Sequence, residues 1–408
     1  MATVLILEIV SNSEKLISEA KMLGHRVVML SNGVDARHIV ERNRALLDDV
    51  LECDLADRAG LSALVGAYHA RHGLDAIVPG FEYFTETAAE LSAELGLRGL
   101  GARARAAVRH KDALRRSLEA TGLRSPRWRL VEGPGDLERA GAAVGFPCVI
   151  KPTSSAGSVH VSRADDAAAL RRAYERMCAE PVIDYGLAPG SRAVVEAFIP
   201  GAEYSVEGVA HGSEIRISAI TEKFLAGETG FLEVGHLVEA ELAPAERQGI
   251  EAYVRAVLAA VEFTVGAFHV EVRMAPEGPV VIEINGRLPG DRIVDLVQLA
   301  KGVSLPRLML QSYLGDALDP LPEGRAERFA GVRFFLGAGA GRLSCVRGLA
   351  ALYRLEGFLE FRLEVPIGAE TSGHQDFRAH LGHAVFAGQD RAAVRSSMGM
   401  AADVISFA

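Results

Sequence analysis

The sequence predicts a multidomain protein that combines an α/β domain with α+β blocks. Over the first hundred residues, short apolar runs alternate with amphipathic stretches, a rhythm typical of βαβ units in a parallel, doubly wound sheet. Beyond this segment, further short strand patterns alternate with turn signals and helical stretches. A chain of 408 residues is long enough for two or three domains.

The first block is expected to be a nucleotide-type α/β domain without a dinucleotide site. Strands are expected at 4–9, 26–30, 50–53 and 76–79, and a helix at 14–23. The first strand-to-helix turn is Val10-Ser11-Asn12-Ser13. It lacks the Gly-x-Gly-x-x-Gly pattern that lets a backbone approach a pyrophosphate, so dinucleotide binding is not expected there.

The middle and last blocks carry further helix and strand patterns. A basic helix is expected from Arg105 to Thr121, and the arginines between Arg98 and Arg116, interleaved with Ala and Leu, are typical of a solvated helix face. Strands are expected at 148–151, 193–198, 204–209, 215–220, 266–274, 280–284, 332–336, 358–365 and 384–387. A linker is expected at Pro320–Gly324 and a closing helix from Asp390.

Composition excludes several classes of protein. The net charge is -9 and the chain has no dense Lys/Arg run, so no nucleic-acid partner is expected. The four cysteines form no Cys-x-x-Cys pair, which favours reduced thiols in a cytoplasm. No signal peptide and no apolar run of about 18 residues is present, so a soluble cytoplasmic protein without a membrane partner is expected.

The strongest chemical signal is a pair of strand patterns joined by the turn Pro276–Pro279. Glu283 and Asn285 lie two residues apart on one strand and therefore share a face, and Glu271 can lie beside that face if the strands pair. Two carboxylates and an amide oxygen suit a hard divalent cation. Arg287 follows on the same face, where it could hold a phosphoryl group. A plain hairpin with solvated polar residues is the alternative.

Two weaker motifs lie upstream. Lys151 ends a buried strand and precedes the small-residue loop Thr153–Ser158, whose backbone N–H groups could wrap phosphates. The chain has no Gly-x-x-x-x-Gly-Lys-Ser/Thr motif, and such a loop can equally be a simple turn. The segment Val194–Glu203 could hold adenine along a strand edge and leave Glu203 for ribose hydroxyls, or it could be only a strand and turn.

Taken in order, these motifs resemble the ATP-grasp superfamily. The resemblance implies an ATP-grasp fold after a Rossmann-like α/β domain, with boundaries at 1–100, 101–322 (lid about 127–197) and 323–408. It implies ATP and Mg²⁺, with Mn²⁺ as a substitute, as cofactors. The implied ATP-binding residues are Lys111, Lys151, Ser154, Ser155, Gly157, Ser158, Glu196, Ala197, Phe198 and Glu203. The implied metal ligands are Glu271, Glu283 and Asn285, with Arg287 stabilising an acyl phosphate. His160 departs from the glycine that many relatives carry.

Within that superfamily the sequence is most similar to L-amino-acid ligases. The segment Gly230–His236 resembles their acceptor site, which implies that Glu233 and His236 face the amino substrate, and Glu233 or His236 is then a candidate to take the ammonium proton. The segments 332–335 and 378–385 resemble their final α+β subdomain. The implied partners are a small-molecule carboxylate and amine, and a homodimer is compatible with the resemblance. Glu233 and His236 could also be ordinary loop residues.

Other functions remain open on the sequence. A carboxylase or a formate-using ligase of purine type would share the ATP site, and a nucleotide-binding protein without turnover would share it too. The glycine-rich segment Gly337–Gly341 invites a nucleotide-binding interpretation. Because it lies between an apolar strand pattern and a second one at 342–346, a hairpin turn is expected instead.

Overall fold

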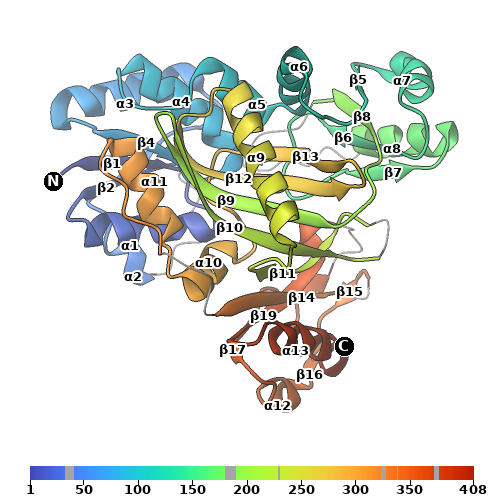
Figure 1. The fold of residues 1–408 in the computed structure, drawn as a ribbon. Coiled ribbons are helices and arrows are strands. Elements are labelled where there is room, and N and C mark those ends of the chain that lie inside the picture. Colours follow the sequence, from blue (N-terminus) through green and yellow to red (C-terminus); the bar gives the residue numbers. More distant parts are fainter. Residues whose placement is uncertain (33–40, 180–189, 228–229, 323–327, 338, 372–375) are drawn as a thin grey trace.

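Three main sheets organise the chain (Figure 1). The computed structural model describes residues 1–32, 41–179, 190–227, 230–322, 328–337, 339–371 and 376–408. Two of the sheets have four strands and the central one has eight. In Figure 1 the N-terminal domain and the smaller upper lobe lie on either side of the upper part of the central sheet, and the C-terminal strands continue that sheet at the bottom of the view.

The N-terminal sheet is parallel, in the order β3-β2-β1-β4, so the predicted fold class is confirmed. Strand β1 is buried along both faces, as expected where helices cover both sides of a sheet. The strands are β1 Thr3–Leu7, β2 Arg26–Ser31, β3 Asp49–Glu52 and β4 Ala76–Pro79. The helices are α1 Lys15–Met22, α2 Glu41–Arg44, α3 Arg58–His72 and α4 Thr85–Glu94.

The second four-stranded sheet is antiparallel and forms the upper right lobe of Figure 1. Its order is β5-β8-β6-β7, and the apolar faces of two helices pack on it. The strands are β5 Trp128–Val131, β6 Cys148–Pro152, β7 Ser162–Ala164 and β8 Ala193–Ala197, and the helices are α7 Leu137–Val144 and α8 Ala167–Ala179.

The central sheet runs in the order β13-β12-β9-β10-β11-β14-β19-β17, with every neighbouring pair antiparallel. The last three strands come from the C-terminal block, which therefore extends this sheet and does not form a sheet of its own. The strands are β9 Glu203–His211, β10 Glu214–Leu225, β11 Glu233–Val238, β12 Val265–Ala275, β13 Gly278–Asn285, β14 Phe329–Leu336, β17 Phe358–Leu363 and β19 His380–Gly388.

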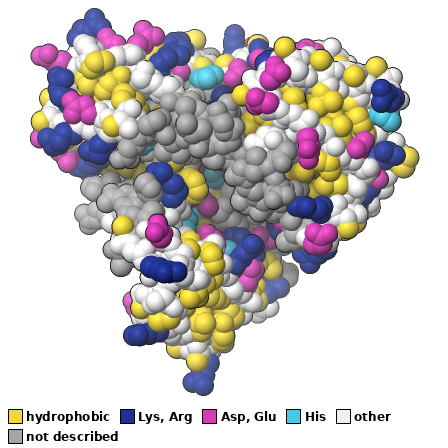
Figure 2. All heavy atoms as spheres, turned by 180° about the vertical axis from the view of Figure 1, so that it is seen from behind, with side chains coloured by type: hydrophobic (Ala, Val, Ile, Leu, Met, Phe, Trp, Pro, Cys, Tyr) yellow, Lys and Arg dark blue, Asp and Glu magenta, His cyan; other side chains and the backbone are white. Residues whose placement is uncertain are grey.

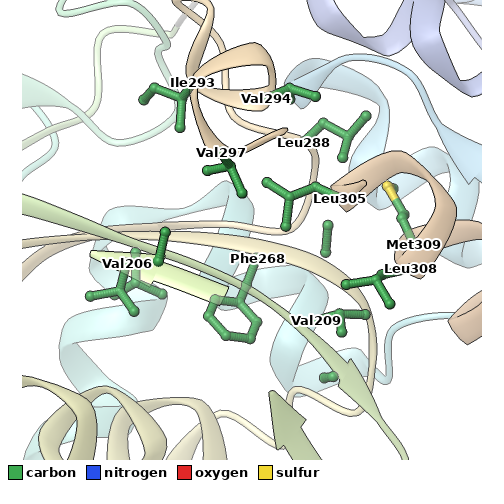
Figure 3. Close-up of a cluster of buried hydrophobic side chains, with 14 of the residues drawn as sticks. Val206, Val209, Phe268, Leu288, Ile293, Val294, Val297, Leu305, Leu308 and Met309 are labelled. Carbon is green, nitrogen blue, oxygen red and sulfur yellow. The ribbon is translucent and has the colours of Figure 1, made fainter. Parts of the chain in front are cut away.

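Helices α9 Pro244–Ala260, α10 Ile293–Lys301 and α11 Leu305–Leu314 pack on the central sheet. The start of α11 is fixed by Ser304, whose side chain accepts a hydrogen bond from the N–H of Arg307, and Pro306 lies in the first turn. Figure 3 shows the apolar faces of α10 and α11 meeting side chains of β9 and β12. This layer joins the N-terminal domain to the central sheet in one continuous core.

The predicted basic helix is wrong in one respect, because the structure has two helices there: α5 Ala102–Arg109 and α6 Lys111–Thr121. His110 between them is extended, with φ -121° and ψ 113°, and cannot continue a helix. The expectation of a fully solvated arginine face is also wrong. Arg115 is completely buried, and its guanidinium reaches back into the protein.

The C-terminal block ends in α13 Arg391–Val404, which confirms the closing helix expected from Asp390, and the side chain of Asp390 caps its N-terminus. The hairpin expected at Gly337–Gly341 does not form among the described residues, and Ala338 lies outside them. Instead β15 Gly341–Arg342 pairs with β18 Glu370–Thr371, away from β14. The remaining short elements are β16 Val346–Arg347, α12 Leu349–Leu352 and β20 Ser406–Phe407. The expected linker falls partly outside the described residues.

On the face that Figure 2 shows, basic and acidic side chains are interspersed and not separated into large patches. Within the described part of the chain, no helix is both long enough and apolar enough to cross a bilayer.

A substitution of Phe268, which lies in the core shown in Figure 3, tests how tightly this core is packed. Its ring has no exposed surface and fills the space above Gly208, where an added Cβ would lie 2.4 Å from Phe268 Cζ. We expect Phe268→Ala to lower the free energy of unfolding by about 3–5 kcal/mol, because it leaves a cavity. Denaturant titration measures this loss. Leu359→Ala, at a half-exposed position, should change it by less than about 1 kcal/mol.

Candidate functional site

A cleft lies where the upper lobe, the central sheet, the N-terminal domain and the C-terminal block meet. It encloses about 1210 Å³, part of it open to solvent, and is lined by residues from all four parts. Glu82 comes from the N-terminal domain, Lys151 from the upper lobe, Glu271 from the central sheet and His380 from the C-terminal block. Most of the chemical groups singled out in the sequence line this one space.

The β12–β13 hairpin brings the three predicted metal ligands into the cleft. Glu271 pairs with Glu283 across the two strands, and Asn285 pairs with His269 one step further along. Asn285 Oδ1 is buried and accepts no hydrogen bond from a described residue. An orphaned amide oxygen beside two carboxylates fits a hard divalent cation, which binds through oxygen ligands.

The two carboxylates of the hairpin lie in different electrostatic surroundings. Burial alone would raise the pKa of Glu271, but Lys223 and His269 outweigh it and hold the pKa at about 2. Burial raises the pKa of Glu283, with Glu82 and Glu271 adding to it, although Lys111 lies 3.2 Å from Glu283 Oε2. The hairpin therefore places two carboxylates in one buried region, where nearby cations stabilise their charged forms.

The two predicted lysines flank this hairpin, and a buried ion network holds one of them. Lys151 Nζ lies 2.8 Å from Glu196 Oε2, and Arg115 Nε lies 2.7 Å from Glu196 Oε1. Burial alone would raise the pKa of Glu196, but the two cations outweigh it and lower the pKa to about 2. Lys111 Nζ donates to the carbonyl of Ser155 at 3.0 Å. Glu196, which lines the cleft, thus orients both Lys151 and Arg115.

The small-residue loop lies over the same space. Ser155, Ala156, Gly157 and Ser158 line the cleft, whereas Ser154 is not among its lining residues. Gly157 has φ +62°, and a Cβ on it would lie 2.5 Å from Phe377 Cδ1, so only glycine fits beneath this ring. His160 also takes a left-handed conformation, with φ 59°.

The residues expected around adenine and ribose make more hydrogen bonds and ion pairs within the protein than predicted. Ala197 and Phe198 line the cleft, but their N–H groups donate to Arg127 and Pro147 carbonyl oxygens at 2.8 Å and 3.2 Å. Glu203 is not free for ribose in this state. Arg273 Nε lies 2.8 Å from its Oε2, and Lys223 Nζ lies 2.9 Å from its Oε1.

Lys223 is the residue around which the acidic groups assemble. Its ammonium group lies 2.6 Å from Glu233 Oε1, 3.0 Å from Glu271 Oε1 and 2.9 Å from Glu203 Oε1. Burial alone would lower the pKa of Lys223, but the three carboxylates hold it well above its usual value. The lysine therefore stays charged and keeps three anions within one small volume.

Glu233 lines the cleft, and His236 lies behind it. His236 has no exposed surface and is not among the lining residues, and its Nε2 lies 3.1 Å from Glu233 Oε2. Burial alone would lower the pKa of His236, but Asp291 and Glu233 raise it to about 9. An imidazole that is protonated at neutral pH cannot accept an ammonium proton, so His236 is corrected from candidate base to positive support for Glu233.

Arg287 projects into the cleft beyond the end of β13. Glu82 holds it, with Oε2 at 2.6 Å from Nη2 and 3.2 Å from Nε. Burial alone would lower the pKa of Arg287, but Glu82 raises it. Glu82 thereby connects the N-terminal domain to the cleft and fixes the guanidinium group of Arg287 there.

Sequence reasoning missed several groups that shape the cleft: Glu82, Arg115, Lys223, His269, Asp291, Phe377 and His380. Lys223 is part of β10, which continues to Leu225 although the apolar run that predicted this strand stopped at Ile220. A charged residue soon after an apolar strand pattern was the only available signal, because the strand order that sets Lys223 near the carboxylates is not visible in the sequence. For Glu82 and Phe377, which approach from distant domains, the sequence offered none.

Comparisons with known proteins agree with this geometry. Three family models match: an ATP-grasp N-terminal domain over residues 17–99, an ATP-grasp domain over 144–295 and an L-amino acid ligase C-terminal domain 2 over 333–408. The chain is 27% identical over 319 residues to a D-alanine–D-alanine ligase of Acidovorax ebreus, covering 72% of this chain and 85% of that protein.

Two further proteins are similar to the chain, the first over a shorter stretch and the second at lower sequence identity. The alanine–anticapsin ligase of Bacillus subtilis is 24% identical over 273 residues, which cover 62% of this chain and 56% of that protein. The crystal structure of an L-amino acid ligase from Bacillus licheniformis superposes with a TM-score of 0.86 at 21% identity, covering 100% of this chain and 98% of that one. This likeness shows that the two chains share a fold.

The buried charges predict how stability depends on pH. The pKa values of His236 and His269 rise from 6.5 to about 9, so the stability that they contribute is present below pH 6.5 and is lost as pH rises through 9. The pKa values of Glu196 and Glu271 fall from 4.5 to about 2, so their contribution is present above pH 4.5 and is lost as pH falls towards 2.

Thermal unfolding measured from pH 3 to 10 should therefore show greatest stability between roughly pH 4.5 and 6.5. His236→Asn should flatten the alkaline limb, since one of the two histidines no longer titrates. An unfolding temperature that stays level or rises between pH 7 and 9 would contradict the charged state of these histidines.

Proposed function

The chain is an ATP-grasp protein, and from this premise we propose that it is an ADP-forming ligase that joins a carboxylate to an amine through an acyl phosphate. The observation that carries the proposal is the β12–β13 hairpin. It sets Glu271 opposite Glu283, with the orphaned Asn285 oxygen beside them, directly below Lys111. Clustered oxygen ligands flanked by cations are what a metal-bound polyphosphate requires.

ATP would lie between the upper lobe and the hairpin. Lys111 and Lys151 would contact its phosphates. Ser155, Gly157 and Ser158 would cover them, and we keep Ser154 of the same loop among the proposed ATP-binding residues. The edge formed by Glu196, Ala197 and Phe198 would flank adenine, and Glu203 would turn towards ribose when nucleotide enters. Mg²⁺, or Mn²⁺, would be held by Glu271, Glu283 and Asn285, where it would neutralise charge on phosphate oxygens.

In the first step, an oxygen of the substrate carboxylate attacks the γ-phosphorus of ATP. The new P–O bond forms as the bond to the β,γ-bridging oxygen breaks, and ADP leaves with that electron pair. Arg287 lies in the cleft with its guanidinium fixed by Glu82. We assign it to the acyl phosphate, because a planar, permanently charged group can hold two phosphoryl oxygens at once.

In the second step, the nitrogen of the amine attacks the acyl carbon. A C–N bond forms, the C–O bond to phosphate breaks, and inorganic phosphate leaves, while Glu233, the remaining candidate base, takes the ammonium proton before or during the attack. Glu233 lines the cleft and stays ionised, because Lys223 and His236 outweigh the effect of burial and lower its pKa. It is suited to hold the incoming ammonium group.

The acyl phosphate must be kept from water until the amine arrives. Phe377 of the C-terminal block lies against Gly157 of the small-residue loop, so these two parts of the chain meet over the cleft. This contact supports a closed reaction space in which the loop excludes water once nucleotide is bound.

Amino acids are the substrates that the comparisons favour. The C-terminal block matches a domain named for L-amino acid ligases, and the named relatives include ligases of alanine. Structures of an N5-carboxyaminoimidazole ribonucleotide synthetase and of a 2-oxoglutarate carboxylase domain with bicarbonate share the fold as well, with TM-scores of 0.71 and 0.72. We therefore keep carboxylation as the second candidate and amide formation between two amino acids as the first.

Loss of one hairpin carboxylate tests the ATP site. We expect Glu283→Ala to lower ADP formation by at least about a hundredfold, because a metal ligand and charge on the transferring group are both lost. Its thermal unfolding should stay cooperative. Glu277→Ala, at an exposed position in the turn of the same hairpin, is the matched control and should keep wild-type turnover. Equal activity in the wild type and Glu283→Ala would overturn the assignment.

The substrate class is tested by measuring phosphate release with amino acids offered singly and in pairs, and with bicarbonate or formate plus an amine. Release that needs amino acids, with a dipeptide detected by mass spectrometry, is the expected result. Release with bicarbonate or formate alone would favour the second candidate. ATP binding without ADP formation in every mixture would mean a nucleotide-binding protein without turnover.

A further inference from the structure

Seven buried or half-buried charged side chains form a continuous chain of alternating sign that ends in the cleft. The members, in order of contact, are Glu207, His269, Glu271, Lys223, Glu233, His236 and Asp291. The first five contacts have N···O distances between 2.6 Å and 3.2 Å. The chain starts at a completely buried carboxylate and crosses the strands of the central sheet towards the loop after β13.

The last contact differs from the others. His236 Nε2 lies 3.8 Å from Asp291 Oδ2, and the side chain of Asp291 is 40% exposed. His236 itself is completely buried, and neither of its ring nitrogens makes a hydrogen bond with a described residue. The carboxylate and imidazole atoms of Glu233, His236 and Asp291 all lie within 4.8 Å of one another. Hydrogen-bonding capacity therefore remains at this end of the chain.

The charges of Glu233, His236 and Asp291, at the cleft end of the chain of contacts, do not sum to zero. Glu233 and Asp291 are both anionic, and the single imidazolium between them cannot neutralise both. Lys223 divides its charge among three carboxylates, of which Glu233 is one. An added positive group would continue the alternation, and Asp291 and Glu233 both line the cleft where such a group could enter.

The backbone holds Asp291 in place at a cost. Asp291 and Arg292 both have positive φ, 50° and 66°, directly before α10. Two consecutive non-glycine residues in this region are strained, and Arg292 is fixed there by Glu360 and Asp295 at 2.6 Å and 3.1 Å. The side chain of Asp291 is thereby aimed into the cleft, four residues along the chain from Arg287.

We propose that Asp291 binds the ammonium nitrogen that stands next to the carboxylate of the acyl donor, and so selects amino acids over simple carboxylic acids. This inference rests on the proposed function, and it specifies the chemical class of the acyl donor as an amino acid. Arg287 and Asp291 line the same cleft with opposite charges. An amino acid carries the matching pair, a carboxylate to be activated near Arg287 and an ammonium group to lie against Asp291.

An organic cation suits this position better than a metal ion. A metal would need a neutral His236 as a ligand, whereas Asp291 and Glu233, outweighing burial, raise the pKa of that imidazole to about 9. A cation on the donor side chain could supply the same charge as its α-ammonium group, and the experiment separates these two sources.

The test compares donors that differ only in the ammonium group. Each amino acid that supports ADP formation is paired with the acid of the same skeleton, such as alanine with propionate and phenylalanine with 3-phenylpropionate. The second substrate is held constant. The measured quantity is the ratio of kcat/KM for the amino acid to that for its desamino acid, in the wild type and in Asp291→Asn. Asparagine is suited to positive φ, so the backbone should be preserved.

We expect Asp291→Asn to lower this ratio at least about tenfold, mainly through KM of the amino acid, because a charge-assisted contact is lost. Asp316→Asn, the same substitution at an exposed position after α11 that does not line the cleft, should leave the ratio unchanged. If only donors with basic side chains lose affinity, the side-chain cation is the ligand and the α-ammonium proposal is wrong.

Other results would also overturn it. An unchanged ratio in Asp291→Asn, or an equal loss for amino and desamino acids, would mean that Asp291 does not select the ammonium group. A Zn²⁺ or Mn²⁺ ion bound in addition to the nucleotide metal, and lost in Asp291→Asn, would make this end a metal site. A wild type that forms no ADP with any amino acid would instead remove the proposed function itself, and this inference with it.

Discussion

The ammonium group of Lys223 is the interaction on which the rest of the site depends. It contacts Glu203, Glu233 and Glu271, which come from three different strands and serve three different parts of the cleft. Three carboxylates at such short separations would repel one another strongly in a buried space without a shared cation. One lysine on β10 thus lets the protein place carboxylates from three strands side by side in a buried space.

The same pattern recurs through the molecule, since each functional charge is held by a buried opposite charge. Glu196 holds Lys151 and Arg115, Glu82 holds Arg287, and His269 stands between Glu207 and Glu271. Buried pairs of this kind contribute little net stability, but they fix side-chain positions closely. They explain how a cleft assembled from four parts of the chain can keep its reactive groups aligned.

The sequence predicted what depends on local pattern. The parallel N-terminal sheet, the hairpin of Glu271 and Glu283 and the closing helix all follow from short-range periodicity and turn chemistry. It failed where tertiary contacts decide. The burial of Arg115 requires Glu196, 81 residues away, and the break at His110 splits an otherwise regular helical pattern. The roles of Lys223 and Asp291 depend on strands and loops that only the fold brings together.

The central claim is that this cleft activates a carboxylate by phosphorylation, and an oxygen label follows that step directly. The amino-acid donor is prepared with ¹⁸O in its carboxylate and turned over with unlabelled ATP, and the released phosphate is analysed by mass spectrometry. An acyl phosphate requires one carboxylate oxygen to leave with the phosphate, so one ¹⁸O per phosphate released is the predicted result. Phosphate without ¹⁸O, formed together with product, would contradict the account.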